Sequence, residues 1–231
     1  MIDKHSAARQ LIDLDNSVAE RIARALSERI VVGLLSPGER LMQDHIAEEF
    51  QASHVPVREA FRKLEAQGLV VSKPRCGVRV SDLDPAMVGE VTEMRAAMEG
   101  LALSHALPRL READLDAARQ ALIEGEASDE IAVWEAANRR FHFSITAPCA
   151  MPRVMALIRD LHHSDARFLF ATWKHLAWQP RSATEHRAIL DAITRRDGDR
   201  ARALLEAHVR EAGRALVERL RSTTPTEADV A

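Results

Sequence analysis

Residues 53–80 read SHVPVREAFRKLEAQGLVVSKPRCGVRV and predict a helix followed by a β-hairpin. In the first half, apolar residues recur at the spacing of one helix face, and a glycine at position 68 is a typical helix stop. The residues expected to face a core are Val57, Ala60, Phe61 and Leu64. The β-prone pieces LVVS and VRVS follow, and KPRCG between them has the proline and glycine of a turn.

Two shorter helices are expected before this stretch. Residues 16–32, NSVAERIARALSERIVV, carry one apolar stripe, formed by Val18, Ile22, Leu26 and Ile30. Asn16 or Ser17 can cap its start, and the SPGE turn at 36–39 ends it. A second helix is expected over Gln43 to Phe50, with one apolar side formed by Ile46, Ala47 and Phe50. Three helices and a basic two-stranded ribbon describe a winged helix-turn-helix domain, which we assign to residues 10–81.

The charge distribution favours nucleic acid as the partner of this domain. The whole chain has a formal net charge of -3, but residues 53–81 hold six Lys or Arg and only two Asp or Glu, a local charge of +4. The flanking parts are both acidic. A basic segment confined in this way indicates a contact with phosphate that the total charge conceals.

Composition and cysteine usage indicate a mainly helical protein of the reduced cytoplasm. Hydrophobic residues make up 46%, aromatic residues only 4%, and tyrosine is absent, which favours helices over a β-sandwich. Cys76 and Cys149 lie far apart without metal or redox spacing. No apolar run approaches the roughly 20 residues of a membrane helix, so no membrane partner is expected.

In a helix-turn-helix, the start of the second helix of the motif faces base edges in the major groove. The residues expected there are Ser53, His54, Val55 and Arg58, with Arg58 the main candidate because its planar fork binds guanine or phosphate in two places. Arg62, one turn on, is expected at phosphate or in solvent. Wing contacts are expected from Lys73, Arg75 and Gly77. A basic helix alone can be ordinary solvated surface, but the short turn before it and the basic ribbon after it favour DNA.

A second, all-helical domain is expected after a linker at residues 82–86. Breaks at Pro108, Gly125 to Asp129, Pro148 to Pro152, Gln179 to Pro180 and Asp197 to Gly198 divide residues 87–222 into about six helices. Such a series predicts an antiparallel bundle that can enclose a pocket and form a dimer. Residues 223–231 are expected to be a disordered tail.

Three of the ten histidines suggest a metal site. His142, His186 and His208 each stand in a different helix beside apolar neighbours, and Asn138 shares a helix face with His142. Neutral imidazoles from three helices, with an amide oxygen, can hold zinc or a similar ion. A solitary helix histidine is more often core or surface, so convergence stays open at this point. His5, His105, His162, His163 and His175 show no paired spacing and receive no role.

The run SPGERLMQDHIAEEFQASHVPVREAFRKLEAQGLVVSKPRCGVRV, residues 36–80, resembles the winged-helix domain of GntR transcriptional regulators. PGERL and PVREA with LEAQGLV carry the likeness. The family's recognition helix usually begins Ser-Arg-Thr-Pro, whereas this chain has Ser53, His54, Val55 and Pro56. His54 has shorter reach and less charge than arginine, so the operator sequence is expected to differ.

Residues 86–220 resemble the FCD ligand-binding domain of the FadR branch of the same regulators. The likeness is carried by VTEMRAAMEGLA, NRRFH, EHRAILDAITRRDGDRA and AHV, at 91–102, 138–142, 185–201 and 207–209. It implies a divalent metal, zinc first and nickel or manganese as alternatives, held by Asn138, His142, His186 and His208. It also implies that Arg95 meets the carboxylate of an organic-acid effector. The family's usual aspartate is Asn138 here, which keeps an oxygen donor but loses a negative charge.

The resulting hypothesis is a homodimeric transcription regulator that binds double-stranded operator DNA and is expected to act as a repressor. A small carboxylate bound between Arg95 and the metal would shift the bundle and release the operator. A regulator that responds to metal without an organic effector is one alternative. A metal-dependent hydrolase is another, with Glu185 as the base, but no catalytic motif supports it.

Overall fold

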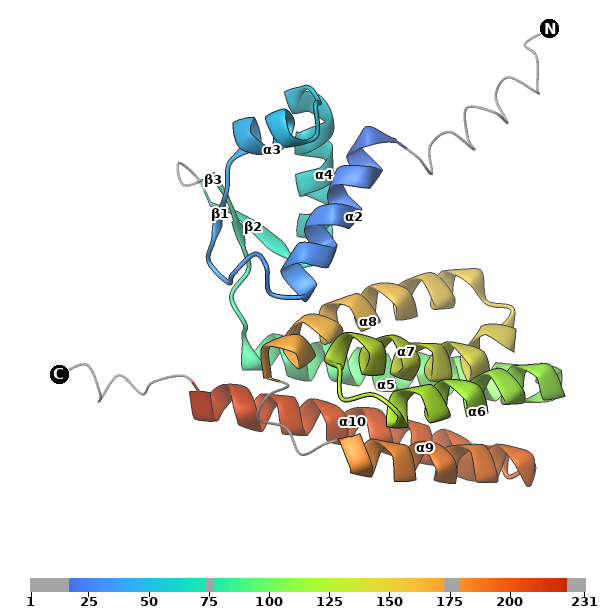
Figure 1. Cartoon of the computed structure of the whole chain (residues 1–231). Coiled ribbons are helices and arrows are strands. Elements are labelled where there is room, and N and C mark those ends of the chain that lie inside the picture. The colour runs from blue at the N-terminus through green and yellow to red at the C-terminus, as the bar shows by residue number, and fades with distance from the viewer. Residues whose placement is uncertain (1–16, 74–76, 173–178, 224–231) are drawn as a thin grey trace, which may run out of the picture. The chain divides into compact units, whose positions relative to one another are not determined.

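The computed structural model describes residues 17–73, 77–172 and 179–223, and the chain divides into two compact units between Asp82 and Leu83 (Figure 1). The first unit consists of α2 (Val18–Val31), β1 (Arg40–Leu41), α3 (Gln43–Glu49), α4 (His54–Ala66), β2 (Val70–Lys73) and β3 (Gly77–Val80). Its sheet has the order β1-β3-β2, with both pairs antiparallel. The winged helix-turn-helix expected from the sequence is confirmed.

Apolar residues from all three helices and the sheet form the core of this unit. The four residues expected from α4 are buried, together with Ile22, Leu26 and Ile30 of α2. Val18 is an exception, because 40% of it remains exposed in the first turn of α2. Ser17 caps that helix by accepting a hydrogen bond from the Glu20 amide.

The short strand β1 was not expected from the sequence. Leu41 pairs with Val78 and is buried, and the guanidinium of Arg79 donates to the carbonyl of Gly38 just before the strand. Two residues are too few to produce an alternating pattern, so periodicity could not reveal this strand. Its pairing adds a third strand beside the hairpin.

The second unit contains, in its described residues, six α-helices: α5 (Pro85–Ala106), α6 (Glu112–Glu126), α7 (Ile131–Thr146), α8 (Pro152–Thr172), α9 (Gln179–Thr194) and α10 (Gly198–Thr223). Single 3-10 turns, η2 (Leu107–Arg109) and η3 (Ala147–Cys149), follow α5 and α7. The expected break at Gln179 to Pro180 is wrong, because both residues are helical. The expected linker is also too long, since α5 begins at Pro85, with the Asp84 side chain accepting from the Ala86 amide. Of the expected tail, residues 224–231 lie outside the described part.

Helix α5 is the central helix of this bundle, in contact with α10, α8 and α7 (Figure 1). The approach of α10 is very close: a Cβ added at Gly213 would lie 2.0 Å from the Thr92 hydroxyl oxygen. Only glycine fits at that point. The close packing matters for function because α5, α7, α9 and α10 carry the buried histidines and their partners.

Candidate functional site

The outer face of α4 is available to a partner. The residues expected to contact DNA on this helix and just before it, Ser53, His54, Val55, Arg58 and Arg62, are all exposed. Ser53 stands at the N-cap position, but its hydroxyl makes no capping hydrogen bond. Because the opposite face is anchored in the core, these side chains project from a fixed helix.

The cations of α4 differ in their partners. Among the described residues, Arg58 and Arg62 have no ion-pair partner, whereas the ammonium of Lys63 is paired with Glu20 of α2. The imidazole of His54 lies 3.6 Å from the carboxylate of Asp44 in α3. Arg58 and Arg62 can therefore bind an anion without first breaking an internal ion pair.

The wing adds further positive charge. Lys73 is exposed at the end of β2, and Gly77 opens β3 with φ +77°, a left-handed conformation that favours glycine. Arg75 lies outside the described residues. The exposed side chain of Arg40 on β1 lies beside Gly77, 3.5 Å from where a Cβ would stand. Arg40 is a candidate that sequence reasoning missed, because β1 itself was missed.

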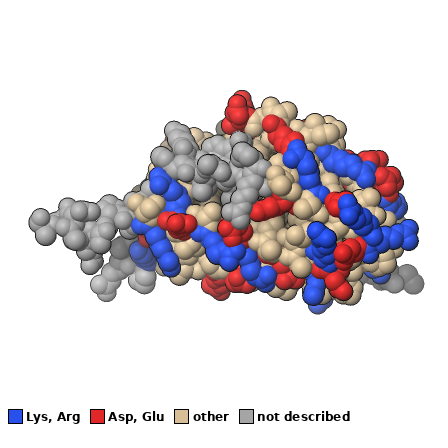
Figure 2. All heavy atoms as spheres, turned by 90° about the horizontal axis from the view of Figure 1, so that it is seen from below, with Lys and Arg blue, Asp and Glu red and all other residues tan. Residues whose placement is uncertain are grey.

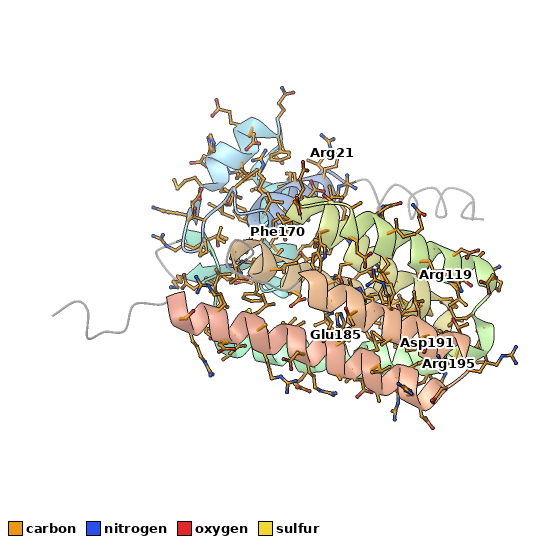
Figure 3. The ribbon with its side chains drawn as sticks, turned by 60° about the horizontal axis from the view of Figure 1, so that its bottom comes forward. Arg21, Arg119, Phe170, Glu185, Asp191 and Arg195 are labelled. Carbon is orange, nitrogen blue, oxygen red and sulfur yellow. The ribbon has the colours of Figure 1, made fainter. Side chains whose placement is uncertain are left out.

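The helical unit lacks a comparable basic surface on the face that Figure 2 shows. Arginine is interspersed there with aspartate and glutamate. Asp191 of α9, for example, pairs with Arg195 just after that helix (Figure 3). On α10, Arg214 pairs with Glu211. Mutual pairing of this kind is typical of solvated helix surface.

The three histidines expected to bind metal converge inside the helical unit. His142, His186 and His208 are all buried, and each offers a ring nitrogen within 4.8 Å of the others. The Nε2 atoms of His186 and His208 are 3.1 Å apart. Three helices, α7, α9 and α10, thus present imidazoles to one small volume.

Carboxylates contact the Nδ1 atoms of two of these rings. Nδ1 of His142 lies 2.5 Å from Oε2 of Glu99, and Nδ1 of His208 lies 2.7 Å from Oε2 of Glu185 on α9 (Figure 3). An ionised carboxylate only accepts hydrogen bonds, so Nδ1 carries the proton in both rings and Nε2 keeps its lone pair. Metal-binding histidines characteristically have such a carboxylate partner. Glu185 therefore supports a ligand here, in place of the base role considered for a hydrolase.

Protonation of the rings is also suited to a metal. Burial lowers the pKa of His142 to about 4 and that of His186 well below its usual value, despite the opposing attraction of Glu99. Both rings are therefore neutral at neutral pH. A neutral imidazole is the form that donates a lone pair to a cation.

Asn138 lies beside this cluster with an unused oxygen. Its Oδ1 atom is buried and has no hydrogen-bond partner among the described residues, and the same is true of Nε2 of His142. Asn138 and His186 line a cavity of about 20 Å³ together with Ser182, whose hydroxyl is also buried and unpartnered. Unsatisfied buried donors and acceptors are costly, so these atoms fit a bound ion or water better than an empty core.

Arg95 is connected to the cluster through Glu99. Its Nε donates to Oε1 of Glu99 at 2.7 Å, and its Nη1 donates to Asp165 of α8. Only 4% of Arg95 is exposed. The side chain expected to bind an effector is thus already balanced by two carboxylates of the protein, whose attraction keeps the pKa of Arg95 above its usual value despite burial.

His162, which received no role from the sequence, belongs to this network. It is buried, and its Nε2 lies 3.0 Å from Oε1 of Glu99 without the alignment of a hydrogen bond. Glu99, His142 and His162 form a second group of possible ligands that shares His142 with the first. The i,i+4 spacing of Arg95 and Glu99, and the i,i+3 spacing of His162 and Asp165, are sequence signals that could have indicated it.

Comparison with known proteins agrees with this architecture. Residues 18–80 match the bacterial regulatory proteins of the gntR family, and residues 90–211 match the FCD domain. The chain belongs to the GntR family. Its FCD domain covers most of the second unit and includes every histidine of the cluster.

Relatives of this GntR regulator include two named repressors of Escherichia coli K12. The transcriptional repressor RspR is 26% identical over 200 residues, 84% of this chain and 86% of its own. The galactonate operon transcriptional repressor is 28% identical over 204 residues, 79% of this chain and 89% of its own. The E. coli McbR/YncC structure, at 22% identity and a TM-score of 0.74, covers 89% of this chain and 99% of its own and shows the same fold.

This GntR protein is a DNA-binding transcriptional regulator and not an enzyme. Within the described residues, none of its helices combines the length and the apolar character needed to cross a bilayer. The predictions of family, fold and regulatory function are therefore confirmed, and the hydrolase alternative is set aside.

Proposed function

We propose that this GntR regulator is a homodimeric repressor whose operator affinity is controlled by a small organic acid bound beside a divalent metal in the FCD domain. The observation that carries the proposal is the convergence of three buried imidazoles, two of them held by carboxylates. Repression, as opposed to activation, is supported by relatives that are named repressors. Action on chromosomal DNA agrees with the cytoplasmic location expected from the cysteines.

At the DNA, the start of α4 would enter the major groove. Arg58 supplies the bidentate contact to guanine or phosphate, and Arg62 lies one turn further along the same face. Exposed Val55 offers an apolar surface for a thymine methyl group, while Ser53 and His54 offer hydrogen bonds. Lys73, Arg75, Gly77 and Arg40 form the wing contact. A dimer would read two half-sites, which multiplies modest affinities.

In the FCD domain, the metal would be held by Nε2 of the three histidines and by Oδ1 of Asn138. This set of three nitrogens and one amide oxygen suits zinc, with nickel or manganese as alternatives. When bound, the metal supplies a buried positive charge that attracts an anion. Its affinity is expected to be moderate, because the amide of Asn138 adds no charge of its own.

Charge balance explains why the effector would be an acid. Arg95 is already neutralised by Glu99 and Asp165, so without metal the group repels a further carboxylate. A dication reverses this balance. Asp165 is the partner of Arg95 on a different helix, and burial raises the pKa of its carboxyl group, so we propose that the effector carboxylate replaces Asp165 at Arg95. That exchange would move α8 against α5 and transmit the signal.

The test begins with elemental analysis of protein purified without added metal, followed by zinc titration of the metal-free protein. Operator affinity is then measured by fluorescence anisotropy on a duplex selected from a random library, with metal-free and zinc-loaded protein, each with and without citrate as a trial carboxylate. We expect citrate to weaken DNA binding only in the zinc-loaded protein, and Arg95→Gln to remove the response while DNA binding remains. Failure of the purified protein to bind zinc would refute the proposal.

A regulator that responds to metal alone is the second candidate. It is favoured by the two carboxylates that already pair with Arg95, because an acid would have to compete with them. This alternative predicts that zinc by itself changes operator affinity and that Arg95→Gln has no effect on that change. The same titrations therefore separate the two mechanisms.

A further inference from the structure

Among the described residues, Glu99 joins the histidine cluster to Arg95. Its side chain has no exposed surface, and its two oxygens serve different partners. Oε2 lies against Nδ1 of His142, while Oε1 accepts from Nε of Arg95. A buried carboxylate without compensation would be strongly destabilised, so these contacts account for its presence in the core.

The negative charge of Glu99 matters because Asn138 stands where an aspartate would have supplied one. An asparagine at a ligand position contributes an oxygen but no charge, and a histidine that ligates a metal through its lone pair adds no charge either. A dication bound only by neutral groups in a buried site lacks charge compensation. Glu99 is a fully buried carboxylate in contact with one of the proposed ligands.

We infer that Glu99 is a positioning residue for the metal site: it fixes the tautomer and orientation of His142 and supplies the negative charge that Asn138 does not provide. Arg95 in turn holds Glu99 in place through its other oxygen. The inference rests on the proposed metal site, which it deepens.

A direct ligand role for Glu99 is disfavoured by the same contacts. Glu99, His142 and His162 could hold an ion by distance alone. The guanidinium of Arg95, however, lies 2.7 Å from Oε1 of Glu99, so a dication there would be placed against a fixed positive charge. The carboxylate is better matched to holding a ligand than to being one.

The test compares Glu99→Gln and Glu99→Asp with wild type and with Glu93→Gln. Glu93 is the matched control, because it is the same residue on the same helix but pairs at the surface with Arg210. Zinc affinity is measured by competition with a chromophoric chelator. The tautomer of His142 is read in the metal-free protein from ¹H–¹⁵N correlations of histidine-labelled samples, because zinc on Nε2 would by itself place the proton on Nδ1.

We expect Glu99→Gln to weaken zinc binding about 10- to 100-fold, the usual effect of losing such a partner, and to remove the Nδ1–H signal of His142. Glu99→Asp withdraws the carboxylate by one methylene but keeps its charge, so it should lose the signal with a smaller loss of affinity. Adding Asn138→Asp to Glu99→Gln should recover affinity but not the signal. Glu93→Gln should behave as wild type in both measurements.

The outcomes separate the inference from the function on which it rests. If wild type binds no zinc, the proposed metal site fails, and this inference falls with it. If wild type binds zinc but Glu99→Gln binds equally well, or keeps the His142 signal, then the inference alone is wrong. Should Glu99→Gln fail to fold, Glu99→Asp carries the same decision, because a merely structural role would lower stability without changing the tautomer.

Discussion

Replacing Arg58 tests the DNA-binding surface most directly. Arg58 is exposed and has no ion-pair partner among the described residues. Its contact with DNA therefore contributes its whole binding free energy, because no internal ion pair has to be broken first. A bidentate base contact contributes about 1–3 kcal/mol, and a dimer uses two copies. Arg58→Ala should therefore cost about 2–6 kcal/mol, an affinity loss from about 30-fold to more than 10⁴-fold at constant salt.

The assay is anisotropy on the selected operator at several salt concentrations. If Arg58 contacts phosphate instead, the slope of log affinity against log salt should fall by about 2 for the two copies. Arg58→Lys keeps the charge but loses the fork, so it preserves the slope and loses base discrimination only where a base is read.

Lys63→Ala is the matched control on the same helix. Its ammonium is paired with Glu20, and an exposed pair of this kind contributes only about 0.2–1 kcal/mol, so the substitution should change operator affinity much less. Arg58→Ala that leaves both affinity and salt slope unchanged would refute the assignment of α4 to DNA.

Further predictions concern the wing, the packing of the bundle and the metal. Arg40→Ala should weaken operator binding and reduce the salt slope by about 1 per copy that reaches phosphate, measured by the same anisotropy titration; an unchanged slope contradicts a wing role. Gly213→Ala should lower the free energy of unfolding, measured in urea, by about 1–3 kcal/mol, because the added methyl group meets Thr92. Gly89→Ala on α5 places its methyl group in open space and should raise the same free energy by about 0.5–1 kcal/mol. Equal stabilities of the two variants would contradict the close contact of α5 and α10. Zinc at about 100 times its Kd should stabilise the wild type by about 2.7 kcal/mol, and His208→Ala should lose this gain in a thermal melt.

Regular elements were predictable because each carries its own periodic signal. The core residues predicted for α4 were all correct, because Val57, Ala60, Phe61 and Leu64 share one face and have no competing role. The prediction that Val18 belongs to the buried stripe was wrong, because Val18 lies in the first turn of α2. The apolar stripe continues there beyond the part of the helix that packs against the core. Strand β1 was invisible because its formation depends on pairing with distant β3.

The site was predictable only in part, for a related reason. His142, His186 and His208 could be selected individually, but their convergence depends on three helix packings that no local pattern encodes. Glu99 and His162 were missed because a charged residue in a helix ordinarily belongs to its solvated face. The burial of Glu99 follows from its place on a face of α5 that packs against other helices, whereas Glu93 on the same helix stays at the surface. His162 is buried because its own helix, α8, packs against α5.

Glu99 also determines how metal and effector can influence each other. An acid that replaces Asp165 at Arg95 would shift the guanidinium that holds Oε1 of Glu99, and with it the carboxylate that holds His142 through Oε2. By linkage, a metal that fixes His142 must change the effector's affinity by the same factor. Asn138 makes this coupling stronger than an aspartate would, because the site then depends on Glu99 for its negative charge. Asn138→Asp should accordingly tighten zinc binding while weakening the dependence of zinc affinity on citrate, and two independent titrations on one variant can decide it.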